Sequence, residues 1–309
     1  MTLTLAPMEG VVDVHMRDIL TRIGGFDLCV SEFVRVSKGI LPAATFRHIC
    51  PELDQGGKTA SGVPVHVQLM GGEASLMAEN AAFVASLGAP GIDINFGCPA
   101  KTVNRHDAGA SLLQWPDRLH EIVCAVRRAV PEEIPVSAKM RLGFSDKSLF
   151  LENAQAIEAG GAMKLTVHAR TKLEGYKAPA HWEYLAPIRE TLSIPVVANG
   201  EIWTVEDFDA CRNISGCADF MVGRGVIARP SLGLEIANRQ DKAFAWPIIL
   251  DWLSYYRNLI MVMDNDVREA GRIKQWVKLL GRSYEEATKL FVDIRRLQTP
   301  DDIQVFLIK

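Results

Sequence analysis

Eight short apolar runs, rich in β-branched residues, recur along the first three quarters of the chain and predict buried β-strands. Several are almost continuously apolar, as expected for parallel strands buried on both faces. The segments between them have helical spacing, and three of these end at glycine, which helices favour just past their C-terminus. The runs span residues 3–8, 27–33, 65–70, 91–97, 136–142, 164–170, 195–200 and 219–225.

This alternation predicts an α/β fold of the (β/α)8 TIM barrel type, whose usual size is about 250 residues. A doubly wound sheet fits less well, because no GxGxxG motif follows the first run. The pattern changes after Trp246, where strand-like runs give way to three long segments of helical spacing. We therefore expect a TIM-barrel domain over residues 1–242, followed by a small C-terminal helical domain over residues 243–309.

Composition restricts the class of protein further. The chain has 48% hydrophobic and 23% charged residues, which is typical of a globular protein and excludes disorder as a whole-chain description. Its amino end lacks the basic region of a signal peptide, and no stretch suits a membrane span. The six cysteines form no CxxC pair and no zinc spacing, so we expect a cytoplasmic protein without a metal site.

Polar residues and glycines end or interrupt seven of the eight runs. In TIM barrels the C-terminal strand ends carry the chemistry, and buried polar side chains there need partners. Two glycine-containing turns, at 199–201 and 223–225, favour a phosphate site with Arg224 adding charge. The strand-end residues are Glu9, Gln68, Asn95, Cys98, Lys139, Arg141, His168, Asn199, Gly200, Glu201, Gly223 and Arg224.

These strand ends carry a family resemblance. The matching segments are APMEG (6–10), EFVRV (32–36), Gln68, NFGCPAKTVN (95–104), KMRLG (139–143), VHARTK (167–172), ANGEIW (198–203) and GRG (223–225). Together they resemble the tRNA-dihydrouridine synthases, and most of all the bacterial C-type members, which reduce uridine 16. The likeness extends over nearly the whole chain. One departure is Phe96, where family members often have Met or Cys.

The resemblance implies FMN as cofactor and NADPH as electron donor. Gln68 would bind the pyrimidine edge of the flavin, and Lys139 would neutralise charge that develops near N1. Pro7, Met8 and Glu9 would border the ring. The ribityl phosphate would be held by His168, Asn199, Gly200, Glu201, Gly223 and Arg224.

Cys98 differs from the other cysteines because it lies between Gly97 and Pro99 at a strand end. Reduction of the uracil C5=C6 bond needs a hydride at C6 and a proton at C5. A neutral thiol, with an ordinary pKa near about 8.5, can supply that proton. We expect Cys98 to be the general acid and Asn95 to hold the uracil edge, so a strongly lowered thiol pKa would count against this role.

The net charge of −3 argues at first against a tRNA substrate, because nucleic-acid binders usually carry a basic surface. The predicted helix at 272–282, however, has a basic half opposite an apolar half, which is also what an ordinary solvated helix face looks like. We expect the tRNA D-loop as partner, with no membrane and no obligate protein partner. The predicted substrate residues are Arg35, Asn95, Arg141, Tyr176, Arg272, Lys274 and Arg295.

Three other functions are weighed against this one. A flavin-dependent dihydroorotate or dihydropyrimidine dehydrogenase would share barrel, FMN and cysteine but take a free pyrimidine, which needs no basic tail. A phosphate-sugar aldolase or isomerase could use Lys139 covalently, because lysines buried in barrel strands form Schiff bases. A non-catalytic RNA-binding module would leave the polar strand ends unexplained.

Overall fold

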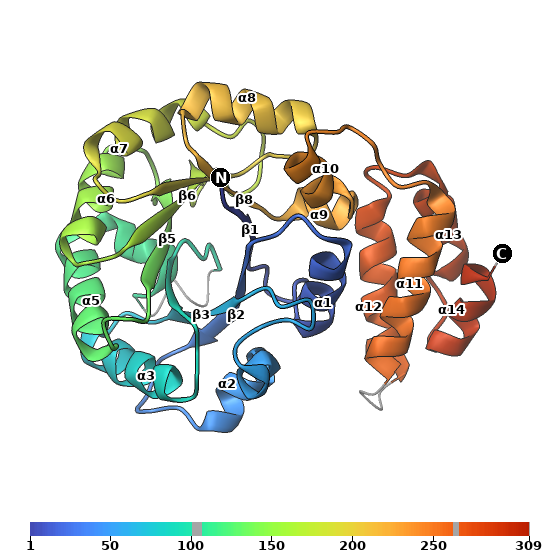
Figure 1. The fold of residues 1–309 in the computed structure, drawn as a ribbon, viewed down its shortest axis with the longest axis horizontal. Helices are drawn as coiled ribbons and strands as arrows, with labels where there is room; N and C mark the ends of the chain where they lie inside the picture. Colours follow the sequence, from blue (N-terminus) through green and yellow to red (C-terminus); the bar gives the residue numbers. More distant parts are fainter. Residues whose placement is uncertain (101–106, 262–265, 309) are drawn as a thin grey trace.

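The computed structural model describes residues 1–100, 107–261 and 266–308, without the side chain at position 266. Eight parallel strands close into a barrel in chain order, with β1 paired to both β2 and β8 (Figure 1). This confirms the predicted TIM barrel. The strands are β1 (Leu3–Leu5), β2 (Leu28–Arg35), β3 (Val65–Met70), β4 (Ile92–Phe96), β5 (Val136–Gly143), β6 (Lys164–Thr171), β7 (Val196–Asn199) and β8 (Asp219–Val222).

Helices surround the barrel as predicted from the segments between the strands (Figure 1). Within the described residues, no helix is both long and apolar enough to cross a membrane. The helices of the barrel part are α1 (Val14–Ile23), α2 (Ala43–Ile49), α3 (Ala74–Ser86), α5 (Pro116–Ala129), α6 (Phe150–Ala159), α7 (Leu185–Thr191), α8 (Val205–Ser215), α9 (Arg224–Ala228) and α10 (Leu232–Asn238). Three short 3-10 segments are η1 (Pro51–Gln55), η2 (Gly109–Gln114) and η3 (Trp182–Tyr184).

The first and last strands are shorter than the sequence predicts. β1 ends at Leu5, and Ala6 makes the last backbone bond to Val222, 2.9 Å long, because the following Pro7 has no N–H to donate. β8 ends at Val222, and Gly223 precedes α9 instead of extending the strand. The first and last motifs therefore lie in turns at the barrel rim.

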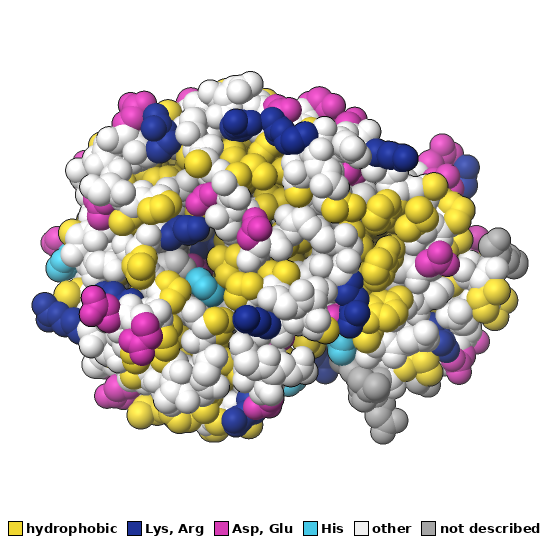
Figure 2. All heavy atoms as spheres, in the orientation of Figure 1, with side chains coloured by type: hydrophobic (Ala, Val, Ile, Leu, Met, Phe, Trp, Pro, Cys, Tyr) yellow, Lys and Arg dark blue, Asp and Glu magenta, His cyan; other side chains and the backbone are white. Residues whose placement is uncertain are grey.

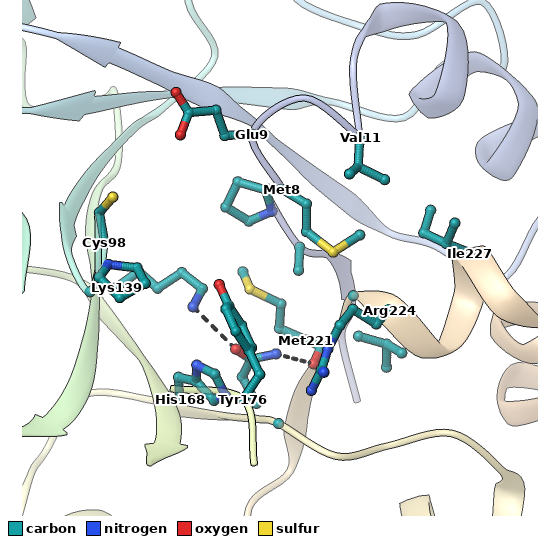
Figure 3. A pocket seen from close by; sticks show the side chains of 18 of the residues that line it. Met8, Glu9, Val11, Cys98, Lys139, His168, Tyr176, Met221, Arg224 and Ile227 are labelled. Carbon is teal, nitrogen blue, oxygen red and sulfur yellow. Dashed lines mark hydrogen bonds between the residues drawn. The ribbon is translucent and has the colours of Figure 1, made fainter. Parts of the chain in front are cut away.

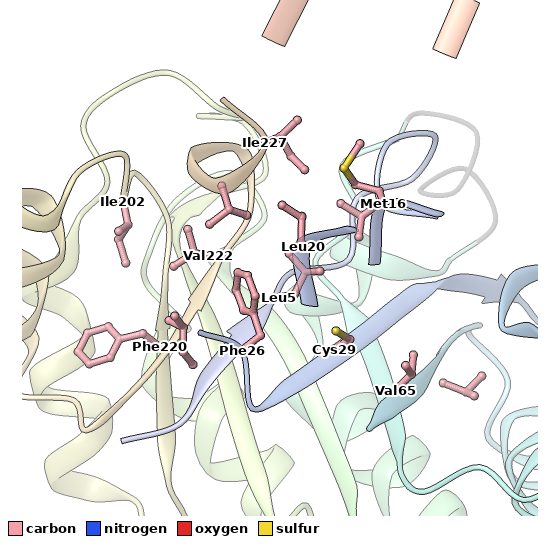
Figure 4. Packing of buried hydrophobic residues seen from close by; sticks show 14 of the residues in the cluster. Leu5, Met16, Leu20, Phe26, Cys29, Val65, Ile202, Phe220, Val222 and Ile227 are labelled. Atoms are coloured by element: carbon pink, nitrogen blue, oxygen red, sulfur yellow. The ribbon is translucent and has the colours of Figure 1, made fainter. Parts of the chain in front are cut away.

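The core has an outer layer between strands and helices and a smaller layer inside the barrel. Figure 4 shows Leu5, Phe220 and Val222 packed with Leu20 and other helix residues in the outer layer. Alternate residues on the same strands face inward. The inner group is Ala6, Val30, Val197 and Met221.

Four helices follow the barrel: α11 (Trp246–Ile260), α12 (Asp266–Leu280), α13 (Glu285–Ile294) and α14 (Pro300–Leu307). They confirm the predicted helical segment and lie beside α1 and α9 (Figure 1). Trp276 of α12 is buried, and its Nε1 donates to the carbonyl of Ile227 at 3.1 Å. The boundary between residues 242 and 243 as a domain division stays a prediction.

Candidate active site

A cavity of about 480 Å³ opens at the C-terminal ends of the strands. Its lining includes every residue predicted for catalysis or cofactor binding, together with Asn95, Arg141 and Tyr176. Figure 3 shows Met8 and Glu9 in the upper part of this pocket, Cys98 and Lys139 at the left, His168 and Tyr176 below, and Arg224 at the right. The structure therefore brings these residues together in one cavity, and their roles in catalysis and binding stay predictions.

Asn95 holds the turn that carries Cys98. The side-chain oxygen Oδ1 of Asn95 accepts hydrogen bonds from the backbone N–H groups of Gly97 at 2.8 Å and Cys98 at 2.9 Å. Burial raises the pKa of the Cys98 thiol, and the nearby charge of Glu9 raises it further. The thiol is therefore protonated at neutral pH, which is the state that a proton donor requires.

Lys139 reaches across the barrel to Asn199. Its Nζ donates to the Asn199 side-chain oxygen at 3.1 Å, and the Asn199 amide nitrogen donates to the Met221 carbonyl at 2.8 Å (Figure 3). Burial lowers the pKa of Lys139 to about 8, the charge of Arg141 lowers it too, and the carboxylate of Asp93 opposes both. The ammonium thus remains charged at pH 7 but titrates not far above it.

The turns after β7 and β8 form the other end of the pocket through close backbone packing. Gly200 has a φ of +118°, and a Cβ there would lie 2.8 Å from Cδ2 of His168. A Cβ on Gly225 would lie 2.1 Å from the carbonyl oxygen of Ile202, so only glycine lets α9 meet the 199–203 turn. These contacts place Gly200, Gly223, Arg224 and Gly225 together in the pocket lining.

Charged side chains, most of them arginines, are concentrated at this end of the pocket. The Arg224 guanidinium lies between the Tyr176 and Trp203 rings, 4.8 Å and 5.0 Å from their centroids, and 3.6 Å from the Glu201 carboxylate. Burial and the neighbouring arginines hold the pKa of His168 well below its usual range. The arginines supply the positive charge that an anionic ligand requires, and the neutral imidazole adds a hydrogen-bonding group at the same end of the pocket.

Sequence reasoning missed Trp203 and Leu279 as pocket residues. Trp203 belongs to the ANGEIW motif, and its Nε1 donates to Glu201 at 2.8 Å, so the motif itself was the available signal. The Arg282 guanidinium lies 3.4 Å from the centre of the Trp203 ring. Leu279 and Arg282 lie on and just after α12, and no local pattern shows that this helix end reaches the barrel rim.

The residues predicted to orient tRNA lie outside the pocket lining. Arg35 ends β2 and Arg295 follows α13, and both are exposed. Arg272 and Lys274 have internal partners instead: Arg272 Nη2 donates to Asp13 at 2.5 Å, and Lys274 Nζ donates to the Leu297 carbonyl at 2.7 Å. Residues 101–104 of the NFGCPAKTVN motif lie outside the described residues.

The surface around the pocket carries mixed charge. On the face shown in Figure 2, Lys and Arg side chains alternate with Asp and Glu, and hydrophobic side chains lie between the barrel and the C-terminal helices. The apolar half of α12 is buried as predicted, with Ile273, Val277 and Leu280 fully covered. Among the described residues, no group of three or more His, Cys, Asp or Glu side chains is placed to hold a metal ion.

Comparison with known proteins decides the family. The model of the family described as "Dihydrouridine synthase (Dus)" matches residues 4–291. The chain belongs to the dihydrouridine synthase family. It is 52% identical to the tRNA-dihydrouridine(16) synthase of Pseudomonas putida over 96% of this chain and 93% of that protein. It is 45% identical to the enzyme of the same name from Haemophilus influenzae, over 99% of each chain.

Solved structures support the fold alone. The barrel matches a 2-naphthoyl-CoA reductase with a TM-score of 0.58 at 13% identity, covering 77% of this chain and 50% of that one. Morphinone reductase matches with a TM-score of 0.54 at 11% identity, covering 79% and 87%.

Family membership makes this dihydrouridine synthase an oxidoreductase that forms dihydrouridine in tRNA, and it implies a flavin cofactor. The resemblance seen in the sequence is thereby confirmed. A dehydrogenase acting on a free pyrimidine, an aldolase and a non-catalytic RNA-binding module are not favoured.

Proposed function

We propose that this dihydrouridine synthase uses FMN and NADPH to reduce uridine 16 in the tRNA D-loop to 5,6-dihydrouridine, in the cytoplasm. The observation that carries the proposal is the meeting of Gln68, Lys139, Cys98 and Arg224 in one cavity. The position is supported by three relatives of 50% to 52% identity over almost the full chain, each named tRNA-dihydrouridine(16) synthase.

The pocket suits FMN in both volume and polarity. Lys139 offers a positive charge from the middle of a strand, and Gln68 offers an amide from the neighbouring side of the barrel. Arg224 and the glycine turns offer charge and close backbone approach for a phosphate. When bound, the flavin supplies the hydride that uracil C6 requires.

The protein's part in the second half of the reaction is to give the proton. Cys98 Sγ donates to C5 of the uracil, and its raised pKa keeps the proton on sulfur until it is needed. The side-chain oxygen Oδ1 of Asn95 already accepts two backbone hydrogen bonds, so the Asn95 side chain can offer the base only an amide N–H. Asn95 therefore pairs with a uracil carbonyl oxygen.

The target nucleotide must leave its stack to enter this pocket. Tyr176 is half-exposed at the mouth, with the Arg141 guanidinium 5.1 Å from its ring centre. Arg141 is held by the carbonyls of Gly97 at 2.8 Å and Gly175 at 2.8 Å, so it stays beside that ring. A fixed aromatic ring beside a fixed cation suits stacking of an extruded base.

The test is the mapping of dihydrouridine in an unmodified tRNA transcript incubated with this protein, FMN and NADPH. Nuclease digestion and mass spectrometry should find a fragment heavier by two hydrogen atoms at position 16, and this fragment should form at least about a hundredfold more slowly with Cys98→Ala. Dihydrouridine at position 17 or 20 would contradict the position but not the chemistry. Reduction of free uracil or orotate without reduction of tRNA would favour a free-pyrimidine enzyme.

A further inference from the structure

Asp93 is a buried carboxylate beneath the pocket that none of the roles above uses. It is the second residue of β4 and is 1% exposed. In the barrel register it is opposite Gln68 of β3 and Ser137 of β5. Asn95 follows two residues later on the same face of β4, one layer closer to the pocket mouth. A carboxylate buried this deeply is costly unless hydrogen bonds or opposite charge compensate for its lost hydration.

Both oxygens of Asp93 accept hydrogen bonds. Gln68 Nε2 donates to one at 2.7 Å, and Ser137 Oγ donates to the other at 2.6 Å. Burial raises the pKa of Asp93, while these two bonds and the charge of Lys139 oppose the rise. The geometry at 2.7 Å places Oδ2 of Asp93 as the acceptor for the Gln68 amide nitrogen.

That acceptor sets the direction of a chain of hydrogen bonds. Because the Gln68 nitrogen faces Asp93, its oxygen faces away and accepts from Asn95 Nδ2 at 2.8 Å. Asn95 then turns its own oxygen to the N–H groups of Gly97 and Cys98. If the Gln68 amide were reversed, oxygen would face carboxylate and nitrogen would face nitrogen, and both bonds would be lost.

We propose that Asp93 is a positioning residue that fixes the amide of Gln68 and, through Asn95, the turn that holds Cys98. This buried series of hydrogen bonds then orients both the Gln68 amide, which is assigned to the cofactor, and the Cys98 thiol, which is assigned to proton transfer. The inference rests on the proposed function, because it is through those assignments that Asp93 affects the reaction.

The experiment compares Asp93→Ala with Asp93→Asn. Asparagine keeps an oxygen that accepts from Gln68, and its nitrogen can donate to Ser137, whereas alanine has no acceptor. Each protein is reconstituted with FMN, and three quantities are measured: the FMN dissociation constant, the visible spectrum of the bound flavin, and the single-turnover rate of uridine reduction in a tRNA transcript.

Asp93→Ala should bind FMN roughly tenfold more weakly, because Gln68 is no longer fixed, and should show an altered flavin spectrum. Uridine reduction at saturating tRNA should slow by at least about tenfold, because the Cys98 turn is less well held. Asp93→Asn should stay within about threefold of wild type on all three measurements. Ser137→Ala is the matched control: it removes the other hydrogen bond to the same carboxylate, and the flavin spectrum should not change.

A second measurement applies even if Asp93→Ala does not fold. Gln68→Glu places a carboxylate against Asp93, and adding Asp93→Asn restores a donor between the two positions. The double variant should therefore bind FMN more tightly than Gln68→Glu alone. A double variant no better than the single one would overturn the proposal.

Wild-type spectrum and rate in Asp93→Ala would also overturn it. So would an Asp93→Asn protein as impaired as Asp93→Ala, because asparagine keeps the oxygen that accepts from Gln68 and should therefore restore the position of that amide. Wild-type protein that bound no FMN at all would instead contradict the proposed function, so the two failures are distinguishable.

Discussion

At the scale of single residues, the environment of Cys98 determines which protonation state it offers. Its side chain is mostly covered, a neighbouring carboxylate disfavours the thiolate, and Asn95 fixes the turn around it. A cysteine nucleophile would need the opposite environment, with a lowered pKa. The site thus stabilises a thiol, which can release a proton but attacks poorly.

Cys98→Ala should therefore separate the two halves of the reaction. FMN binding and flavin reduction by NADPH should remain near wild type, because neither uses the thiol. Uridine reduction in tRNA should fall by at least about a hundredfold, the contribution typical of general acid catalysis. Stopped-flow absorbance measures the first half and single-turnover mapping the second. Cys124→Ala, on α5 outside the pocket lining, is the control, and normal tRNA turnover in Cys98→Ala would remove Cys98 from the mechanism.

Lys139 gives a prediction about pH. Its pKa is lowered to about 8, so its positive charge is present below that value and lost as the pH rises through it. The rate of flavin reduction should therefore decline above about pH 8. Lys139→Met should be slow at every pH and lack this decline. A wild-type rate that stays constant to pH 10, or a variant that keeps the decline, would assign the titration to another group.

At the scale of elements, the strand ends were predictable because polar residues and glycines mark them in the sequence. A polar residue that interrupts an apolar run, as Gln68 and Lys139 do, or that ends one, as Asn199 does, shows its own depth and direction, since position along a barrel strand fixes its place in the pocket. The ends of two strands, β1 and β8, were not marked in this way. β1 stops at Leu5 because of Pro7, and Gly223 leaves β8 because α9 must pack against Ile202.

The turn between β8 and α9 supports a prediction for Arg224. Its guanidinium is held between two aromatic rings and beside Glu201, so its charge is fixed at the glycine-rich end of the pocket. Arg224→Ala should yield protein depleted of flavin, with the FMN dissociation constant raised by about tenfold or more. Fluorescence titration with FMN measures this. Arg239→Ala is the control, because Arg239 is exposed and pairs with Asp209; equal losses in both variants would contradict the assignment.

At the scale of the whole molecule, the C-terminal helices both complete the pocket and extend the surface beyond it. Leu279 lines the cavity, and Arg282 stacks on Trp203 of the barrel. The helical pattern of α12 predicted its buried half, but not that its end meets the barrel rim, because that contact joins segments far apart in the sequence. For the same reason the sequence did not show that Arg272 and Lys274 have internal partners.

Those partners decide which residue best tests tRNA docking. Charge reversal of Arg272 would break its bonds to Asp13 and to the Tyr256 hydroxyl, 3.1 Å away, and would loosen the attachment of α12 to the barrel. Weak tRNA binding in that variant would have two explanations. Arg295 is exposed beyond α13, so its reversal changes the surface charge with less effect on packing.

Arg295→Glu should weaken tRNA binding and reduce the slope of log affinity against log salt by about one, as expected for a lost phosphate contact. Flavin reduction by NADPH should be unaffected, because Arg295 lies outside the pocket lining. The control is Arg128→Glu, an equal change of charge on the exposed side of α5, across the barrel from the C-terminal helices. If both variants lose affinity equally, general charge attraction explains the binding. If only Arg295→Glu shows weaker tRNA binding and a smaller salt slope, the helical segment positions the tRNA. It then also determines which uridine enters the pocket.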